Sequence, residues 1–252
     1  MKKIITFWSI FSILLSGCNT LWNKTTASES QQPTLSGYWV DHTGDRRNII
    51  HHGDLSARID LNTLAGFPNL YAIGPVTGLQ GEVTIYDGVP SISTIVDGKP
   101  KVDASFSHGA IFLAYANSPS WQSINVLQSL ESLGAIEAFV KTSAIQAGIA
   151  LDKSFPFRIE GIANKLVYHI IFKTDGKPHN KAEHKKAKRK FYLKNTKVEI
   201  IGFWAGGQGE GVFTHPGKKT HLHFRLPDNS TSGHIDAITM PGGSQLYLPE
   251  DK

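Results

Sequence analysis

The chain has 252 residues, of which 40% are hydrophobic and 19% are charged, and its formal net charge is +5. This composition is ordinary for a globular protein, and the length allows one large domain or two small ones with a real core. The charge is modest and no nucleic-acid-binding motif occurs, so we expect no nucleic acid partner.

The N-terminus has the features of an export signal. Met1–Lys3 is basic, and Ile4–Leu15 is apolar but too short to span a bilayer. Leu15–Cys18 matches the bacterial lipoprotein signal, and Cys18 is the only cysteine. We expect residues 1–17 to be a signal peptide and Cys18 to carry the lipid that anchors the protein to a membrane. The alternative is an ordinary secretory peptide with an incidental cysteine.

The residues after Cys18 predict a tethered protein of the cell envelope. Residues 18–34 are rich in Ser, Thr, Asn and Gln, which is typical of a flexible linker. The residue after the cysteine is Asn19 and not an aspartate. That difference favours the outer membrane, if the cell has one. We expect the folded domain to comprise residues 35–252.

The first half of this domain favours β-strands up to residue 115 and helices after it. Short apolar stretches alternate with turn signals such as Asp87-Gly88. Residues 118–149 change to a helical period, with a break near Gly134, and predict one or two amphipathic helices. The expected strands comprise residues 37–40, 70–74, 83–87, 91–96, 101–106 and 109–115.

The second half returns to strands, at residues 157–160, 165–172 and 198–204. Residues 181–190 are strongly basic. They either contact anionic lipid headgroups or form a solvated helix face, and the second interpretation is favoured. Residues 206–211 are rich in glycine but lack the residues of a phosphate-binding loop, so we expect an ordinary loop.

Three histidines follow at spacings of two and eleven. If Leu222 and Phe224 form an apolar strand face, His221 and His223 point together to the other face, with their Cα atoms roughly 7 Å apart. The intervening residues 227–233 are dense in turn formers and would return His234 beside the pair. Three neutral imidazoles on such a hairpin would form an open tetrahedral Zn²⁺ site.

The motifs around this hairpin resemble those of the α-acetolactate decarboxylase family. The resemblance covers nearly all of the folded chain, and its most specific parts are the histidine triplet and the motif Gly-Leu-x-Gly-Glu. The matching segments are residues 52–54, 78–82, 87–88, 157–161, 177–178, 201–204, 215–217, 221–224 and 233–234.

This resemblance implies an α+β fold of two β-rich, mixed-sheet subdomains packed together with a few helices, about 35–150 and 151–252, in a chain that could form a homodimer. It implies that His221, His223 and His234 bind Zn²⁺ and that Glu82 is an active-site carboxylate. The implied reaction converts 2-acetolactate to acetoin and CO₂. The metal would act as a Lewis acid on the ketone and hydroxyl, and Glu82 would assist proton transfer.

Three positions depart from the family pattern. Pro75 replaces a threonine, which removes a hydroxyl and a backbone N–H. His169 stands where the family has an arginine, and an imidazole cannot bind a carboxylate through two parallel hydrogen bonds as a guanidinium does. Arg158 or Lys165 could compensate in principle. The family also continues beyond the position of Lys252 into a tail that contributes another carboxylate.

These departures leave two alternatives to acetolactate decarboxylation. The chain could be a zinc enzyme that acts on a different oxo acid, or a metal-bearing binding lipoprotein without turnover. On the first two hypotheses, we expect the partner to be a small oxo acid and Glu82 and His169 to be the catalytic residues.

Overall fold

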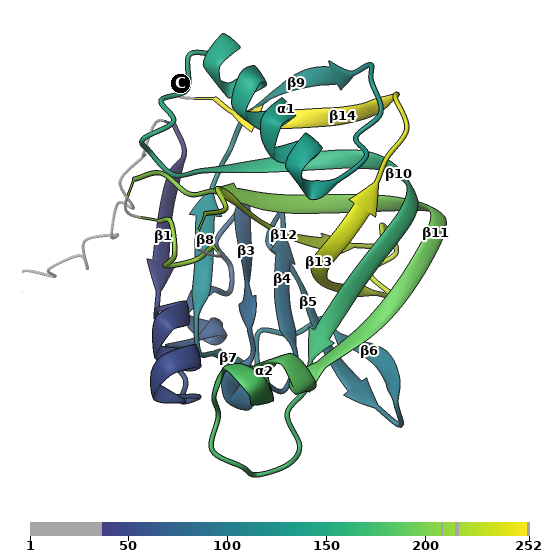
Figure 1. The fold of residues 1–252 in the computed structure, drawn as a ribbon. Coiled ribbons are helices and arrows are strands. Elements are labelled where there is room, and N and C mark those ends of the chain that lie inside the picture. The colour runs from purple at the N-terminus through teal and green to yellow at the C-terminus, as the bar shows by residue number, and fades with distance from the viewer. Residues whose placement is uncertain (1–36, 208, 215–216, 251–252) are drawn as a thin grey trace, which may run out of the picture. The chain divides into compact units, whose positions relative to one another are not determined.

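The computed structural model describes residues 37–207, 209–214 and 217–250, within the compact unit Leu35–Lys252 (Figure 1). The expected signal peptide (1–17), the tether (18–34) and Cys18 lie outside the described residues. In the described part of the chain, no helix is long and apolar enough to cross a membrane.

The first half forms a six-stranded antiparallel sheet in the order β1-β8-β3-β4-β5-β6. Tight turns with positive φ at Asp87-Gly88 and Asp97-Gly98 connect neighbouring strands. The bounds are β1 Trp39–Thr43, β3 Leu70–Pro75, β4 Glu82–Tyr86, β5 Val89–Val96, β6 Lys99–Asp103 and β8 Leu113–Asn117. Short elements flank this sheet: η1 (Asn48–His52), η2 (Leu61–Leu64), η3 (Thr77–Leu79) and the ribbon of β2 (Ile59–Asp60) with β7 (Gly109–Ala110).

The second half forms another six-stranded antiparallel sheet, in the order β11-β12-β13-β10-β14-β9. Two 17-residue strands dominate it, and in Figure 1 they cross the upper part of the molecule and then bend down its right-hand side. The bounds are β9 Trp121–Val126, β10 Phe155–Ile171, β11 Lys188–Trp204, β12 Thr220–Arg225, β13 Ser232–Thr239 and β14 Ser244–Pro249, with α1 at Leu133–Gln146 and α2 at Lys181–Ala187.

Strands β10, β11, β12 and β13 close into a ring, because β10 pairs with β11 as well as with β13. Alternation along each strand then sends side chains to two different places. Leu222 and Phe224 of β12 are buried in one core cluster together with residues of β10, β11 and β13. The neighbouring positions of the ring face the first sheet. There Ile201 and Phe203 of β11 share a second core cluster with residues such as Phe112.

The predicted fold class is confirmed, with two corrections inside it. Every strand pairing in the described residues is antiparallel, and none makes a mixed sheet. Residues 121–126 are strand β9, where the apolar spacing predicted helix, because they pair with β14 at the far end of the chain. The change from one sheet to the other therefore falls between Asn117 and Trp121, earlier than the expected division near residue 150.

Two other predictions concern helices. A helix does form within 118–149, as α1, and Ser132 caps its start by accepting a hydrogen bond from the Ala135 N–H at 3.1 Å. The basic stretch 181–190 is helical only up to Ala187, and Lys188 already begins β11. The lysines after that point therefore follow the period of a strand.

Candidate metal centre

Strand register places three histidines in a row across three neighbouring strands. His169 of β10 pairs directly with His234 of β13, which pairs directly with His223 of β12. Ring centroids lie 4.4 Å apart for His169 and His234 and 5.4 Å apart for His223 and His234. His221 lies 5.0 Å from His234 and 5.2 Å from His223 by the same measure. The structure thus brings the expected triplet and His169 together.

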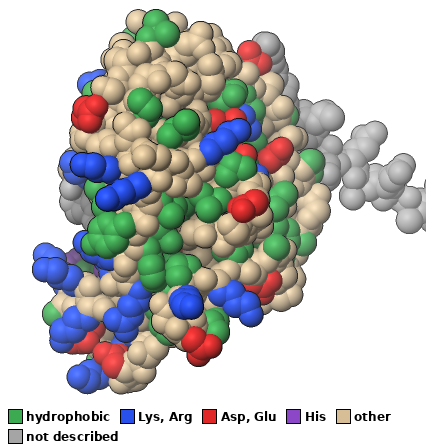
Figure 2. Space-filling view, turned by 90° about the vertical axis from the view of Figure 1, so that its right-hand side faces the viewer, with side chains coloured by type: hydrophobic (Ala, Val, Ile, Leu, Met, Phe, Trp, Pro, Cys, Tyr) green, Lys and Arg blue, Asp and Glu red, His purple; other side chains and the backbone are tan. Residues whose placement is uncertain are grey.

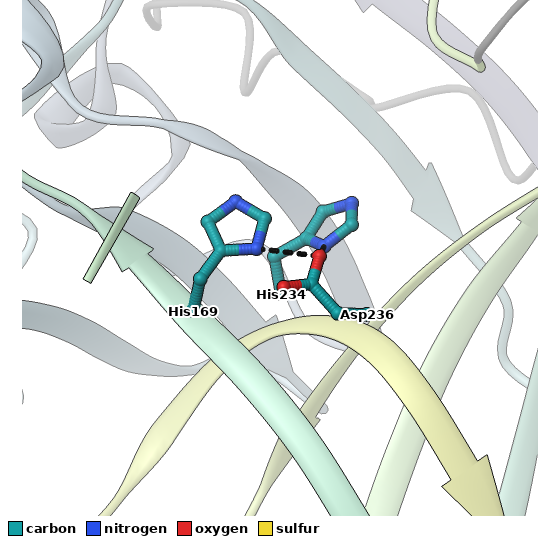
Figure 3. Close-up of side chains that lie close together, drawn as sticks. All are labelled: His169, His234 and Asp236. Atoms are coloured by element: carbon teal, nitrogen blue, oxygen red, sulfur yellow. Dashed lines mark hydrogen bonds and ion pairs between the residues drawn. The ribbon is translucent and has the colours of Figure 1, made fainter. Parts of the chain in front are cut away.

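A buried group on these strands could hold a metal ion. Donor atoms of His169, His234 and Asp236 all lie within 4.8 Å of one another, and Figure 3 shows the three side chains converging above β10 and β13. Asp236 was not among the predicted site residues. Its position two residues after His234 on the same strand, and hence on the same face, is the sequence signal that could have indicated it.

The hydrogen bonds of the histidines leave other ring nitrogens available for a ligand. Thr84 Oγ1 lies 3.0 Å from His223 Nδ1, and His169 Nδ1 donates to Asp236 Oδ1 at 2.9 Å. Such partners orient an imidazole and direct its second nitrogen outward. In the described part of the chain, His223 Nε2 and His234 Nδ1 are buried with no hydrogen-bond partner. A bound metal ion would satisfy both atoms, so these residues fit one.

Burial keeps the histidines in the form that metals bind. It lowers the pKa of His169, and it lowers the pKa values of His223 and His234 well below the usual range. Charge repulsion from neighbouring histidines acts in the same direction for His223 and His234, whereas Asp236 opposes the shift at His169. Neutral imidazoles are the state that ligates Zn²⁺, so the protein holds these ligands ready at neutral pH.

Glu82 faces this row from the first sheet. Its carboxylate oxygens lie 3.6 Å from His169 Nε2 and 3.9 Å from His223 Nε2, and the Ile171 N–H donates to Oε1 at 3.2 Å. Gly81 before it has φ +154°, and a Cβ there would overlap the Ser93 carbonyl oxygen.

The carboxyl of Glu82 is not half of an ion pair with His169. Burial raises its pKa to about 8, while burial lowers the pKa of His169. The two groups therefore face each other in their uncharged forms at neutral pH, and the carboxyl keeps its proton.

His169, His221, His234 and Glu82 line a cavity of about 350 Å³, which suits a small molecule. Pro75, one of the departures from the family pattern, also lines it. Most of the wall is apolar and comes from both halves of the unit: Ile49, Phe112, Ile171, Phe213, Leu222 and Ile235.

The cations near this cavity are not the expected ones. Arg158 lies among aromatic side chains elsewhere, and Lys165 lines an adjoining pocket. Arg46, Lys188 and the exposed Lys218 line the cavity instead, and sequence reasoning singled out none of them for this role. The apolar alternation at Phe191 and Leu193, extended upstream, could have placed Lys188 on a strand.

Three solved structures share this fold over most of their length. The α-acetolactate decarboxylase of Bacillus subtilis strain 168 superposes with a TM-score of 0.67 at 15% identity, covering 84% of this chain and 85% of that one. The acetolactate decarboxylase of Bacillus subtilis subspecies spizizenii gives 0.66 at 15% identity, with coverage of 84% and 86%. A Staphylococcus aureus protein of unknown function, described as similar to α-acetolactate decarboxylase, gives 0.66 at 14% identity, with 84% of each chain covered.

The chain has the acetolactate decarboxylase fold. No protein-family model matches the sequence, and no curated protein sequence matches it. At 14–15% identity, the structural match establishes the architecture of the chain and leaves its activity to be argued from the site.

Proposed function

We propose that this chain is a zinc-dependent decarboxylase that converts 2-acetolactate to acetoin and CO₂. The observation that carries the proposal is the row of histidines next to Glu82, at a small cavity in an acetolactate-decarboxylase-like fold. This arrangement combines a potential metal site with a buried carboxyl group, and both are needed for the chemistry below.

His221, His223 and His234 are the proposed ligands, and the buried, unpartnered nitrogens of His223 and His234 support this choice. The set of His169, His234 and Asp236 is the alternative. When bound, Zn²⁺ would supply Lewis-acid stabilisation of the negative charge that develops on the ketone oxygen as CO₂ leaves.

The proposed role of Glu82 is to hold and deliver a proton. Breaking the C–C bond to the carboxylate releases CO₂ and leaves an electron pair on the former α-carbon. The Glu82 carboxyl gives its proton to that carbon, forms the new C–H bond, and regains a proton from water afterwards. His169, held by Asp236 and 3.6 Å from Glu82, keeps this carboxyl in place. The apolar walls limit the access of water to the carbanion.

The deciding experiment is CO₂ release from 2-acetolactate by the zinc-loaded protein. Glu82→Gln preserves the shape of the side chain but removes the transferable proton. We expect it to retain zinc and to lower kcat by about 10²–10⁴-fold. Glu131→Gln, at an exposed position before α1, is the matched control and should keep full activity. Equal turnover in wild type and Glu82→Gln would refute the assigned role.

A zinc enzyme for a different oxo acid is the second candidate. Pro75 in the cavity wall and His169 beside His234 motivate it, since both alter the surroundings of a bound substrate. Release of CO₂ from a related oxo acid, with none from 2-acetolactate, would select this candidate. Bound zinc without turnover on either compound would favour a binding lipoprotein.

We also propose that the protein is exported and anchored through Cys18. The support is the apolar stretch of residues 4–15 followed by the lipoprotein signal ending at Cys18. Metabolic labelling with a radioactive fatty acid should mark the wild type and not Cys18→Ser. Equal labelling of both proteins, or of neither, would overturn the proposal.

A further inference from the structure

Besides the exposed Lys218, two partly buried cations line the cavity from elements outside the histidine hairpin. Arg46 lies just before η1, and Lys188 lies where α2 ends and β11 begins. Both side chains are partly buried. His184 of α2 lines the same cavity. Segments distant in sequence thus bring positive charge to the lining of a cavity that also includes Glu82, His221 and His234.

Neither cation has an ion-pair partner in the described part of the chain. Asp45, next to Arg46, accepts hydrogen bonds from the side chain and backbone of Arg47. Among carboxylates, Asp236 raises the pKa of Lys188 the most. It already accepts a hydrogen bond from His169 at 2.9 Å and lies 3.8 Å from Lys190. Both cations therefore keep donors for a ligand in the cavity.

Partly buried cations without an ion-pair partner among the described residues are costly, because burial disfavours the charged form. Burial lowers the pKa of Lys188 and of Arg46. The Arg46 charge lowers the pKa of Lys188 further, and both charges lower the pKa of His184. A bound metal ion would add positive charge to the same cavity. An anion between the cations would remove the repulsion and accept charge-assisted hydrogen bonds from both.

We infer that Arg46 and Lys188 bind the carboxylate of a small hydroxy or oxo acid in the cavity, while the rest of that ligand lies beside the histidines. This inference deepens the proposed function and rests on it for the nature of the ligand. It assigns recognition of the anionic group to β11 and the segment before η1, although His169 on β10 was the position at which an arginine was expected. His169 is committed to Asp236 and need not carry charge.

Binding of two unreactive probes to the zinc-loaded full chain tests the inference. The first probe is 2,3-dihydroxy-2-methylbutanoate, which has a carboxylate but no ketone and so does not decarboxylate. The second is butane-2,3-diol, which lacks the carboxylate. Lys188→Met and Arg46→Gln should each weaken calorimetric binding of the first probe by at least about 30-fold. Neither change should alter binding of the diol.

Matched variants separate a specific effect from a change in net charge. Lys194→Met and Arg189→Gln remove the same charges from exposed positions of β11 and should leave both affinities unchanged. Lys188→Arg keeps the charge and should retain binding of the carboxylate probe. It also serves as the test variant if Lys188→Met fails to fold.

Three outcomes would overturn the inference: unchanged affinity for the carboxylate probe in both Lys188→Met and Arg46→Gln, an equal loss for the diol, or no saturable binding of the carboxylate probe to wild type. These outcomes are independent of turnover. Lys188-dependent binding without CO₂ release would refute the proposed decarboxylation and keep the anion site. CO₂ release with unchanged probe binding in both Lys188→Met and Arg46→Gln would refute the anion site and keep the proposed decarboxylation.

Discussion

Two buried polar clusters lie between the sheets, and they differ in how far their charged and polar groups are paired within the protein. The Arg158 guanidinium carbon lies 4.4 Å from the ring centroid of Tyr247 and 4.8 Å from that of Trp121. The same guanidinium donates to the Tyr71 hydroxyl at 3.0 Å and lies 3.3 Å from Glu160. Its charge is paired with Glu160 and lies among aromatic rings, although Arg158 Nε is buried without a hydrogen-bond partner in the described residues.

The histidine cluster is less completely paired. Among the described residues, His223 Nε2 and His234 Nδ1 have no hydrogen-bond partner, and His234 lines the cavity. A polar cluster that satisfies its own charge stabilises the fold, whereas one that leaves donors and acceptors open beside a cavity is suited to bind a ligand. Arg158 is therefore a structural residue, although its position in the sequence made it a candidate for substrate binding.

The largest expected effect is loss of metal in His223→Ala. Mutation of a residue that only orients a metal ligand typically weakens metal binding by roughly 10–100-fold. His223→Ala removes a proposed ligand itself, so the affinity for Zn²⁺ should fall by more than that. Metal analysis after dialysis against a zinc buffer should find about one Zn²⁺ per wild-type chain and far less in the variant. The exposed His51→Ala is the control. Full zinc content in His223→Ala would exclude His223 as a ligand.

Asp236→Asn distinguishes the two sets of ligands. If Asp236 only orients His169, the change should weaken Zn²⁺ binding by about 10–100-fold in a chelator competition assay. Asp97→Asn, in an exposed turn, should have no effect. Complete loss of metal in Asp236→Asn, together with retention in His223→Ala, would place the ion among His169, His234 and Asp236 instead.

Arg158→Met should affect stability and leave the metal in place. The change removes the cation from its aromatic surroundings and leaves Glu160 without its cationic partner. We expect the free energy of unfolding to fall by about 1–3 kcal/mol. Urea denaturation measures the loss, and Arg189→Met on the exposed side of β11 is the control. Reduced zinc content in a folded Arg158→Met protein would contradict the distinction between the two clusters.

The smallest effect concerns pH and His184. Burial, reinforced by Lys188, lowers the pKa of His184 to about 3 from an ordinary value of 6.5. Below pH 6.5, His184 is protonated in the unfolded chain but stays neutral in the folded protein, so the free energy of unfolding falls as pH falls towards 3. Above pH 6.5, His184 is neutral in both states and does not change the free energy of unfolding. At pH 5 the contribution is at most about 2 kcal/mol.

His184→Asn should therefore make the decrease in unfolding free energy between pH 6.5 and 5 shallower than in wild type. Other buried histidines contribute to both proteins and cancel in the comparison. Exposed His51→Asn should follow the wild-type curve. An identical slope for His184→Asn and wild type would show that folding does not lower the pKa of His184. Urea denaturation at several pH values measures these slopes.

Part of the basic stretch 181–190 has a position that the sequence-based interpretation did not include. Figure 2 shows Lys and Arg side chains gathered towards the lower part of one face, beside hydrophobic ones. Only residues up to Ala187 of the basic stretch form the expected helix. Lys188 contributes to the cavity instead, because the strand that it begins returns alongside β10.

The sequence by itself determined the local features of this protein. Alternation at Leu222 and Phe224, followed by a turn-rich segment, predicted the hairpin that carries His221, His223 and His234, and the register confirms that geometry. The family resemblance predicted the fold class. These features depend on residues close together in the chain, or on motifs that keep their order.

Only the tertiary structure decided the features that arise from distant pairing. Residues 121–126 have a helical spacing of apolar residues but form β9 because β14 offers them a strand partner. Arg46, Lys188 and Asp236 reach one cavity because strand register and the closed ring bring their elements together. The local spacing of apolar residues does not predict such contacts, because they depend on loop closure and on pairing between strands distant in sequence.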